Sequence, residues 1–239
     1  MMKTIRVFTL LAALAAVPAS AQTTAGDAQT SISVNIATQL QQREFTTANS
    51  LTIFGETATF SAAHSIDKGL LFDVSGARAT GFRQLWVSFG FSTFSDTSSA
   101  ALTTSIPHPV FFNRSLVSTS TVADLDHSEV GIHLAAMWVV PVMDNIEVAV
   151  FGGPSFIRTN QDLVQNIQNP TAAQVASPIV VKQSATAAGV NAGVDFRYRV
   201  NNTIGAGFLL RYAGGTAKLE SASVKVGGTQ IGVGLRVYF

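Results

Sequence analysis

The sequence ends in Gln230-Ile-Gly-Val-Gly-Leu-Arg-Val-Tyr-Phe239, and this stretch predicts the fold. Every second residue in it is large and apolar, namely Ile231, Val233, Leu235, Val237 and Phe239. The residues between them are polar or small. A repeat of two places alternate side chains on opposite faces of a β-strand. We therefore predict a final strand with one apolar face that ends on an aromatic residue.

The same alternation continues upstream and predicts further strands. In chain order they lie at residues 69–77, 84–94, 128–140, 146–157, 187–200 and 203–213. We expect a first strand near Ile32, Val34 and Ile36, although the apolar stretch from Leu51 to Phe60 competes for that position. The alternative for this stretch is a hairpin inside a loop.

Short and long connections alternate between these strands. The short ones fall near residues 78–83, 141–145 and 201–202, and the long ones near 40–66, 95–126, 159–185 and 215–227. Outer-membrane barrels join their strands by short periplasmic turns and longer extracellular loops. The predicted fold class is therefore all-β: a closed, antiparallel, up-and-down transmembrane barrel of eight strands. Ten strands are possible if Leu51 to Phe60 enters the barrel as part of a pair.

The composition favours a membrane protein without a membrane helix. Mean hydropathy is +0.32 and only 12% of residues are charged, which is low for a soluble domain. The longest apolar candidate, residues 130–153, is interrupted by His133, Pro141 and Asp144. A closed barrel is the other structure that satisfies the backbone in lipid. A soluble periplasmic β-sandwich is the competing interpretation, because its strands alternate in the same way.

The N-terminus has the pattern of a secretory signal peptide. Lys3 and Arg6 precede an apolar run, and Ala19-Ser20-Ala21 forms a small-residue cleavage site. We predict a cleaved signal peptide over residues 1–21 and a single barrel domain over residues 22–239. The chain has no cysteine, so disulfides and a lipid-modified cysteine are excluded.

The charge balance argues against nucleic acid as a partner. Removing Lys3 and Arg6 from the 15 basic residues leaves 13, against 14 acidic residues. Binding to phosphate requires a clustered basic surface, and the sequence has no cluster of Lys or Arg.

The polar faces of the predicted strands carry eight charged residues, whereas the apolar faces carry none. The eight are Asp73, Glu129, Glu147, Asp195, Arg197, Arg199, Arg211 and Arg236. An eight-stranded barrel has an interior just wide enough for side chains to fill. Charges removed from water must be paired, so we expect a lumen charge network of Arg–carboxylate pairs in a packed, structural interior. The alternative is a narrow ion pathway that opens when these pairs rearrange.

Two other kinds of site are weak candidates. Potential metal ligands gather near one end of a strand, namely Asp124, Asp126, His127, Glu129 and His133. Residues two apart on a strand are about 6.8 Å apart, which is long for one shared ion. A catalytic set of His127, Asp126 and Ser128 could be assembled at the same rim, but no established catalytic motif is present. We expect no catalytic residue, no metal and no cofactor.

One predicted loop is apolar. Residues 106–113 read Ile-Pro-His-Pro-Val-Phe-Phe-Asn, with two prolines that stiffen the segment. Exposed aromatic residues of this kind can mark a contact surface. The alternative is that the segment folds back over the barrel mouth.

From the N-terminal signal to the terminal aromatic residue, the chain resembles small bacterial outer-membrane barrels of the OmpA/OmpX type. The resemblance implies a C-terminal assembly signal, carried here by Gly234, Val237 and Phe239. Members of the family usually have a polar residue seven positions before the last aromatic one, and Gly232 occupies that position here. The implied partners are outer-membrane lipid, the outer-membrane assembly machinery and periplasmic chaperones.

The fold alone does not decide the activity, because the family includes anchors, adhesins, small pores and enzymes. Our first hypothesis is a non-enzymatic structural and surface protein of the cell outer membrane in a Gram-negative-type bacterium, with loops facing the exterior. The second is a porin-like channel for ions or small solutes. The third is an enzyme at the rim that acts on lipid or peptide. The ligand of the loops stays open.

Overall fold

The computed structural model describes residues 29–82, 84–168 and 177–239, and these contain ten β-strands. The strands are β1 (Thr30–Gln39), β2 (Arg43–Ile53), β3 (Glu56–Ile66), β4 (Gly69–Ala79), β5 (Leu85–Pro107), β6 (Ser115–Met143), β7 (Ile146–Gln168), β8 (Ser177–Arg199), β9 (Ile204–Lys218) and β10 (Ser223–Tyr238). No helix in these ranges is long and apolar enough to cross a membrane. The predicted signal peptide, residues 1–21, lies outside the described residues.

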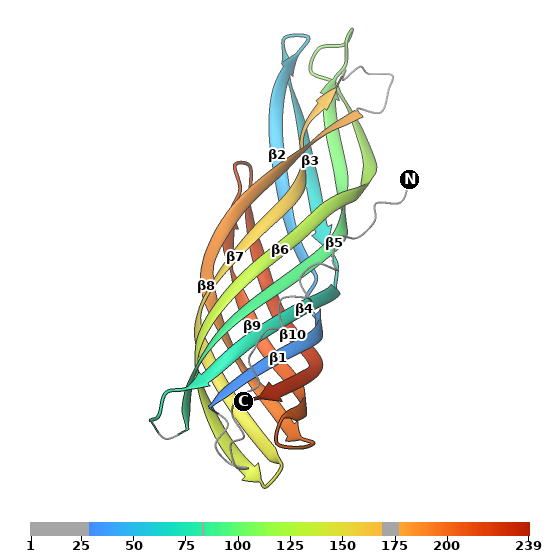
Figure 1. The fold of residues 1–239 in the computed structure, drawn as a ribbon. Coiled ribbons are helices and arrows are strands. Elements are labelled where there is room, and N and C mark those ends of the chain that lie inside the picture. The colour runs from blue at the N-terminus through green and yellow to red at the C-terminus, as the bar shows by residue number, and fades with distance from the viewer. Residues whose placement is uncertain (1–28, 83, 169–176) are drawn as a thin grey trace.

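Eight of the strands close into a ring (Figure 1). The order around it is β5-β4-β1-β10-β9-β8-β7-β6, and β6 pairs back with β5. All pairings in the ring are antiparallel, and the first and last strands join through partners such as Ile32 and Val237. The predicted closed, up-and-down barrel of eight strands is confirmed, as is the first strand near Ile32.

The remaining two strands, β2 and β3, form a hairpin between β1 and β4. The hairpin turns at Phe54-Gly55, where both residues have positive φ (53° and 79°), as a two-residue hairpin turn requires. Strand β3 of this hairpin extends the sheet beside β5, because Thr59–Ser65 of β3 pair with Ser99–Ser105 of β5. The stretch from Leu51 to Phe60 is thus a hairpin within a connection, and the alternative of ten barrel strands is wrong.

Short connections gather at one end of the barrel, which we call the turn end. β4 ends at Ala79 and β5 begins at Leu85, β6 ends at Met143 and β7 begins at Ile146, and β8 and β9 are joined by residues 200–203. Asn201 accepts hydrogen bonds through Oδ1 from the backbone N–H groups of Thr203 and Ile204 at 2.9 and 2.8 Å. This local bonding explains why Asn occupies the turn. The C-terminus lies at the same end (Figure 1).

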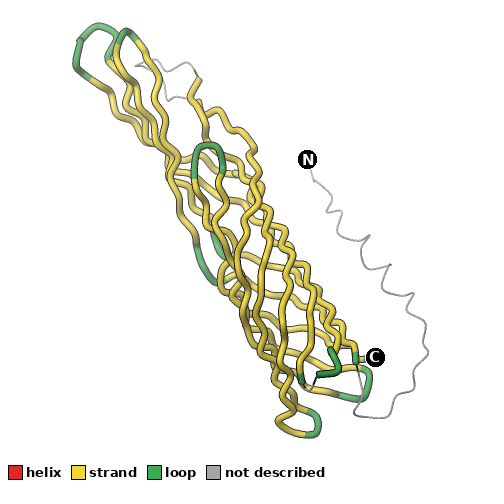
Figure 2. The backbone as a smooth tube through the Cα atoms, turned by 90° about the vertical axis from the view of Figure 1, so that its left-hand side faces the viewer, coloured by secondary structure: helices red, strands yellow, loops and turns green. Residues whose placement is uncertain are grey.

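At the opposite end the structure differs from the prediction of long loops. β5 and β6 stay paired as far as Pro107 and Ser115, and β7 and β8 as far as Gln168 and Ser177. We call the β2–β3 hairpin and these outer parts of β5–β8 the extension. Figure 2 shows that it continues the barrel wall into an elongated shape.

The strands change polarity where the extension begins. On β5 the outward side chains run Val87, Phe89, Phe91, Thr93, Ser95, Thr97, from apolar near the turn end to polar in the extension. The inward side chains change in the opposite sense, from Ser88, Gly90 and Ser92 to Ala100, Leu102 and Ile106. The extension escaped prediction because its apolar residues occupy the face that is polar in the rest of the strand.

The extension has an apolar core like that of a soluble protein. Side chains from β3, β5, β6 and β7 pack together in it, namely Phe60, Ala62, Ala100, Leu102, Ile106, Leu125, Val164 and Ile167. A second buried cluster lies on the barrel side and includes Ile66, Leu71, Phe94, Leu163 and Leu219. We call the part of the ring between the turn end and the extension the lower barrel. Its interior is polar, apart from an apolar cluster at the turn end that includes Trp86, Met137 and Val139, and the interior above it is apolar.

Candidate functional site

The lower barrel carries an apolar band on its outside. Large apolar side chains are exposed on strands all around the ring, with Ile36 at 64% and Leu235 at 61%. Arg78 at the turn end and Arg158 at the other edge are charged residues on the outward rows where this band ends. A soluble sandwich would bury such rows against a second sheet. The band is what a strand presents to hydrocarbon.

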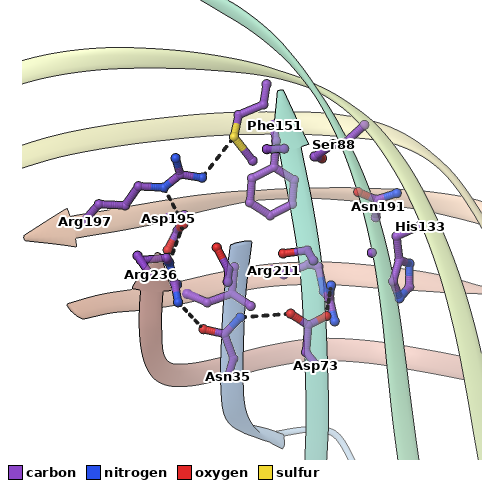
Figure 3. Close-up of a pocket in the computed structure, with 17 residues that line it drawn as sticks. Asn35, Asp73, Ser88, His133, Phe151, Asn191, Asp195, Arg197, Arg211 and Arg236 are labelled. Atoms are coloured by element: carbon purple, nitrogen blue, oxygen red, sulfur yellow. Dashed lines mark hydrogen bonds and ion pairs between the residues drawn. The ribbon is translucent and has the colours of Figure 1, made fainter. Parts of the chain in front are cut away.

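The inside of the lower barrel contains a continuous chain of charged and polar contacts (Figure 3). Asp195 of β8 accepts from two arginines, Arg197 Nε at 2.7 Å and Arg236 Nη2 at 2.5 Å. Arg236 Nη1 donates to Asn35 Oδ1 at 2.7 Å, and Asn35 Nδ2 donates to Asp73 Oδ1 at 2.9 Å. These contacts link strands β8, β10, β1 and β4 across the interior.

At its other end this series of contacts reaches Arg211 of β9. Its Nη1 donates to Asp73 Oδ2 at 2.7 Å, and its Nε donates to Gln230 Oε1 at 2.8 Å. The side chains of Arg211 and Asp73 are 5% and 1% exposed, so both charges are removed from bulk water. Hydrogen bonding between ionised groups is what makes such burial tolerable.

Glycine makes room for one of these arginines. A Cβ placed on Gly207 of β9 would lie 2.4 Å from Cζ of Arg236. The guanidinium therefore rests directly on the backbone of the neighbouring strand. Any larger residue at Gly207 would have to move the most buried charge in the barrel.

A fourth ion pair lies closer to the turn end. Arg199 Nη2 contacts Glu147 Oε1 at 2.6 Å, and its guanidinium lies 4.4 Å from the centre of the Tyr238 ring. These side chains are partly exposed, at 20% for Arg199 and 14% for Glu147. The structure thus places all eight sequence-derived charges on the inward face, and seven of them lie in the lower barrel.

The eighth, Glu129, lies at the barrel mouth and pairs with Arg43, which the sequence prediction placed in a loop. Arg43 opens β2 and its Nη1 contacts Glu129 Oε1, while Glu129 Oε2 accepts from the N–H of Gly227 at 3.0 Å. The guanidinium also lies 5.7 Å from the centre of the Phe94 ring. A lone arginine in a loop gives no sequence signal that it will enter the interior. Arg43 therefore fastens the hairpin to the mouth.

The remaining free space in the charged interior is small. A cavity of about 30 Å³ lies among the side chains of the lower barrel, with Asp73, Asp195, Arg197, Arg211 and Arg236 in its wall (Figure 3). One water needs about 10–15 Å³ measured in this way, so the space admits about two waters or one small ion. The interior is filled, as the width of an eight-stranded barrel dictates.

His133 also lies in this wall, and its contacts separate it from the residues weighed as metal ligands. Its Nε2 lies 2.8 Å from Ser92 Oγ and its Nδ1 lies 2.7 Å from Ser155 Oγ. His127 instead contacts Glu129 at 3.0 Å and Gln161 at 2.6 Å. Among the residues that the structure describes, no three His, Asp or Glu side chains are placed to share a metal ion.

The candidate catalytic set at the rim is split between the two faces of β6. His127 points inward and is buried, whereas Asp126 and Ser128 point outward. Asp126 lies instead near Lys182, at 3.5 Å on the outer surface. The three side chains therefore cannot act on one substrate.

The apolar segment between β5 and β6 lies at the distal tip of the extension, not over the barrel mouth. Val110, Phe111 and Phe112 are exposed there, Phe112 at 73%. The tip touches the β2–β3 hairpin through the N–H of Asn113, which donates to Glu56 Oε1 at 2.7 Å. The alternative in which this segment folds back is wrong.

A buried histidine lies within the extension, outside the apolar band. His64 of β3 stacks on Phe45 with ring centres 4.7 Å apart. Burial lowers the pKa of His64 to about 4. Its Nε2 lies 3.3 Å from Thr47 Oγ1, and that hydroxyl donates to the Val164 carbonyl. The hydroxyl then accepts from Nε2–H, so the neutral ring that the low pKa favours carries its hydrogen on Nε2.

The three residues of the resemblance-based assembly signal lie at the turn end of β10. Val237 and Phe239 face outward, and Phe239 exchanges backbone hydrogen bonds with Thr30 at the start of the ring. Gly234 faces inward, and a Cβ there would lie 1.9 Å from the Val34 carbonyl oxygen. Gly234 thus allows β1 and β10 to approach closely where the ring closes.

No protein-family model matches this sequence, and neither does any curated protein. Among solved structures the chain is similar to the outer membrane protein OprG from Pseudomonas aeruginosa, at 10% identity over 89% of this chain and 96% of that chain, with a TM-score of 0.49. It is similar to Neisserial surface protein A at 14% identity over 88% and 97% of the two chains, with a TM-score of 0.42. It is also similar to Ail of Yersinia pestis at 10% identity over 88% and 99%, with a TM-score of 0.40. Closure of the ring is established by this chain's own strand pairing.

Proposed function

We propose that the protein is an integral β-barrel of a bacterial outer membrane, exported through the secretory pathway, with a non-enzymatic structural and surface role. The observation that carries this proposal is the reversal of polarity along the strands. The lower barrel is apolar outside and charged inside, while the extension is polar outside and apolar inside. One chain needs both patterns only if lipid surrounds the first part and water the second.

The two ends of the barrel support one orientation in the membrane. Short turns are typical of the periplasmic side, and a large folded projection is typical of the exterior. The turn end then faces the periplasm and the extension faces outward. In this orientation β10, with Gly234, Val237 and Phe239, is available on the periplasmic side to the assembly machinery and chaperones during insertion.

The filled interior supports a structural role over a channel. The cavity of about 30 Å³ is lined by charged side chains that contact one another, and apolar clusters occupy the interior above it. An ion entering from the extension would have to cross these apolar clusters. No observation in the described residues favours a continuous aqueous path.

The extension supports the surface role. It presents exposed Phe54, Val110, Phe111 and Phe112 at its distal end, with Arg114 beside the Phe111 ring at 5.8 Å. Apolar groups exposed at the point farthest from the barrel are suited to contact with another surface. The separation of His127 from Asp126 and Ser128 supports the non-enzymatic assignment at the rim.

Planar-bilayer recording of the purified, refolded protein tests this proposal. We expect no unitary conductance steps at either polarity in about 1 M KCl, where exposed charges are largely screened. Incubation with phospholipid, lipid A and peptide should leave all three unchanged. Reproducible conductance steps would establish the channel instead, and product formation would establish the enzyme.

A further inference from the structure

The charges around the lower cavity do not balance. Three arginines, Arg197, Arg211 and Arg236, line its wall, whereas only two carboxylates do, Asp73 and Asp195. The fourth ion pair of the lower barrel, Arg199 with Glu147, is neutral as a pair. His133 contacts two serine hydroxyls, and both contacts suit a neutral ring. The cavity wall therefore has one formal positive charge in excess.

The inward carboxylate that could offset this charge lies elsewhere. Asp96 is four residues beyond Ser92 on β5, which corresponds to about 13 Å along the strand. The ring of Phe94 lies between them on the same face. At the mouth, Glu129 is already paired with Arg43. Neither carboxylate is placed to neutralise the lower cavity.

Two arginine nitrogens at this cavity carry N–H donors that have no acceptor in the described part of the chain. Arg197 Nη1 and Arg211 Nη2 are buried atoms without a hydrogen-bond partner among the described residues. The two side chains are only 1% and 5% exposed, and both line the cavity (Figure 3). A buried guanidinium N–H that lacks an acceptor costs free energy, more than a neutral donor does.

We propose that the cavity binds one small monovalent anion of the halide type, held by the unpartnered N–H of Arg197 Nη1 or of Arg211 Nη2. Such an ion cancels the excess charge and at the same time gives an unpaired N–H an acceptor. The volume of about 30 Å³ admits a single halide and excludes organic anions. The inference goes beyond the proposed function, because an ion bound in the wall of a closed interior need not pass through it.

Water is the competing occupant, and charge distinguishes the two. A water molecule accepts the hydrogen bonds but leaves the excess positive charge in place. An anion therefore makes stability depend on the identity of the salt, whereas water does not. The ion is supplied during refolding, so that it is present when the barrel closes.

The test is to refold the protein into detergent in sodium bromide or in sodium gluconate at equal ionic strength. The midpoint of thermal unfolding is then measured by the shift between folded and unfolded bands on a gel. We expect the midpoint to rise with bromide concentration, by about 5 °C between the dissociation constant and a hundredfold excess. Equal midpoints in the two salts would overturn the proposal.

A charge-filling variant separates the cavity from general salt effects. Ser88 lines the cavity and lies between Ala77 and Ala135 on the paired strands, which leaves room for a larger side chain. Ser88→Asp supplies a fixed carboxylate, so its midpoint should be the same in bromide and gluconate. Ser88→Asn has nearly the same shape without the charge and should keep the bromide dependence. Retained dependence in Ser88→Asp would contradict the site.

Crystals of the wild-type protein refolded in bromide provide an independent readout that needs no variant. Anomalous scattering should show a bromide peak inside the barrel, next to Arg197 Nη1 or Arg211 Nη2. Bromide found only on the outer surface would refute the proposal, whatever the gels show.

Discussion

Arg211 and Asp73 meet at 2.7 Å inside the barrel although their strands, β9 and β4, are not neighbours in the ring. Two strands, β10 and β1, lie between them. The pair therefore spans the interior across the junction where the first and last strands of the chain close the ring. Closure is secured both by the β1–β10 ladder and by charges that reach across it.

Replacing Asp73 by Asn should destabilise the barrel strongly. The change is nearly isosteric but leaves Arg211 buried without its counter-charge, which costs about 3–5 kcal/mol. Glu147→Gln breaks the more exposed pair with Arg199, so its cost should be markedly smaller. Urea unfolding in detergent, followed by tryptophan fluorescence, compares the two. Equal losses would show that burial does not set the strength of these pairs.

Gly207→Ala should lower stability, while Gly76→Ala should be nearly neutral. A Cβ on Gly207 would lie 2.4 Å from Cζ of Arg236, whereas a Cβ on Gly76 meets no atom within 4 Å. Both glycines are in strands, so the intrinsic backbone effect is shared. Urea unfolding in detergent, as above, measures the stability of both variants. A neutral Gly207→Ala would mean that Arg236 can move without loss.

The sequence predicted the lower barrel well because one physical rule governs it. Lipid requires an apolar outward row, so alternation alone located β4, the lower part of β5 and the other ring strands, together with their inward charges. The same rule failed in the extension. There Ala100, Leu102 and Ile106 face inward and Thr103 faces outward, so the sense of the alternation is reversed.

Which charges pair could not be predicted from the sequence. The partner of Asp73 depends on the stagger of strands around the closed ring, and no local pattern encodes it. Arg43 was missed for a related reason, since its contact with Glu129 depends on how the β2–β3 hairpin lies against the mouth. The alternation along a strand predicts which face a residue occupies, whereas its contacts across the interior depend on how the ring closes.

An arginine on the outward face should be costly in the band and tolerated in the extension. Leu235→Arg places a charge among exposed apolar side chains and should destabilise the barrel by about 2–4 kcal/mol. Thr103→Arg places the same charge on the outward face of β5 in the extension, where water solvates it. Both variants are refolded into lipid vesicles and unfolded in guanidinium. A similar cost at the two positions would argue against lipid contact in the band.

The β2–β3 hairpin should loosen as the pH falls below about 6.5, the ordinary pKa of histidine. Burial lowers the pKa of His64 to about 4 in the folded state, so the unfolded hairpin binds more protons between these values. Stability then falls as the pH decreases through this window and is constant above it. Hydrogen exchange of the β2 and β3 amides, corrected for intrinsic rates, reports the change.

His64→Phe is the matched control for this experiment. It keeps an aromatic ring against Phe45 but cannot be protonated. Its hairpin exchange should therefore be independent of pH between 4 and 6.5, after the same correction. If the variant and the wild type loosen equally on acidification, another group is responsible.

The absence of cysteine from the chain allows the most direct test of the arrangement in the membrane. Single cysteines are introduced at Thr103 in the extension, at Leu235 in the band and at Asn202 in a turn, and intact cells are treated with a membrane-impermeant maleimide. We expect Thr103→Cys to be labelled, Leu235→Cys to stay unlabelled even after the envelope is permeabilised, and Asn202→Cys to be labelled only after permeabilisation. Labelling of Leu235→Cys at the rate of Thr103→Cys would contradict the account, because the apolar band would then face water.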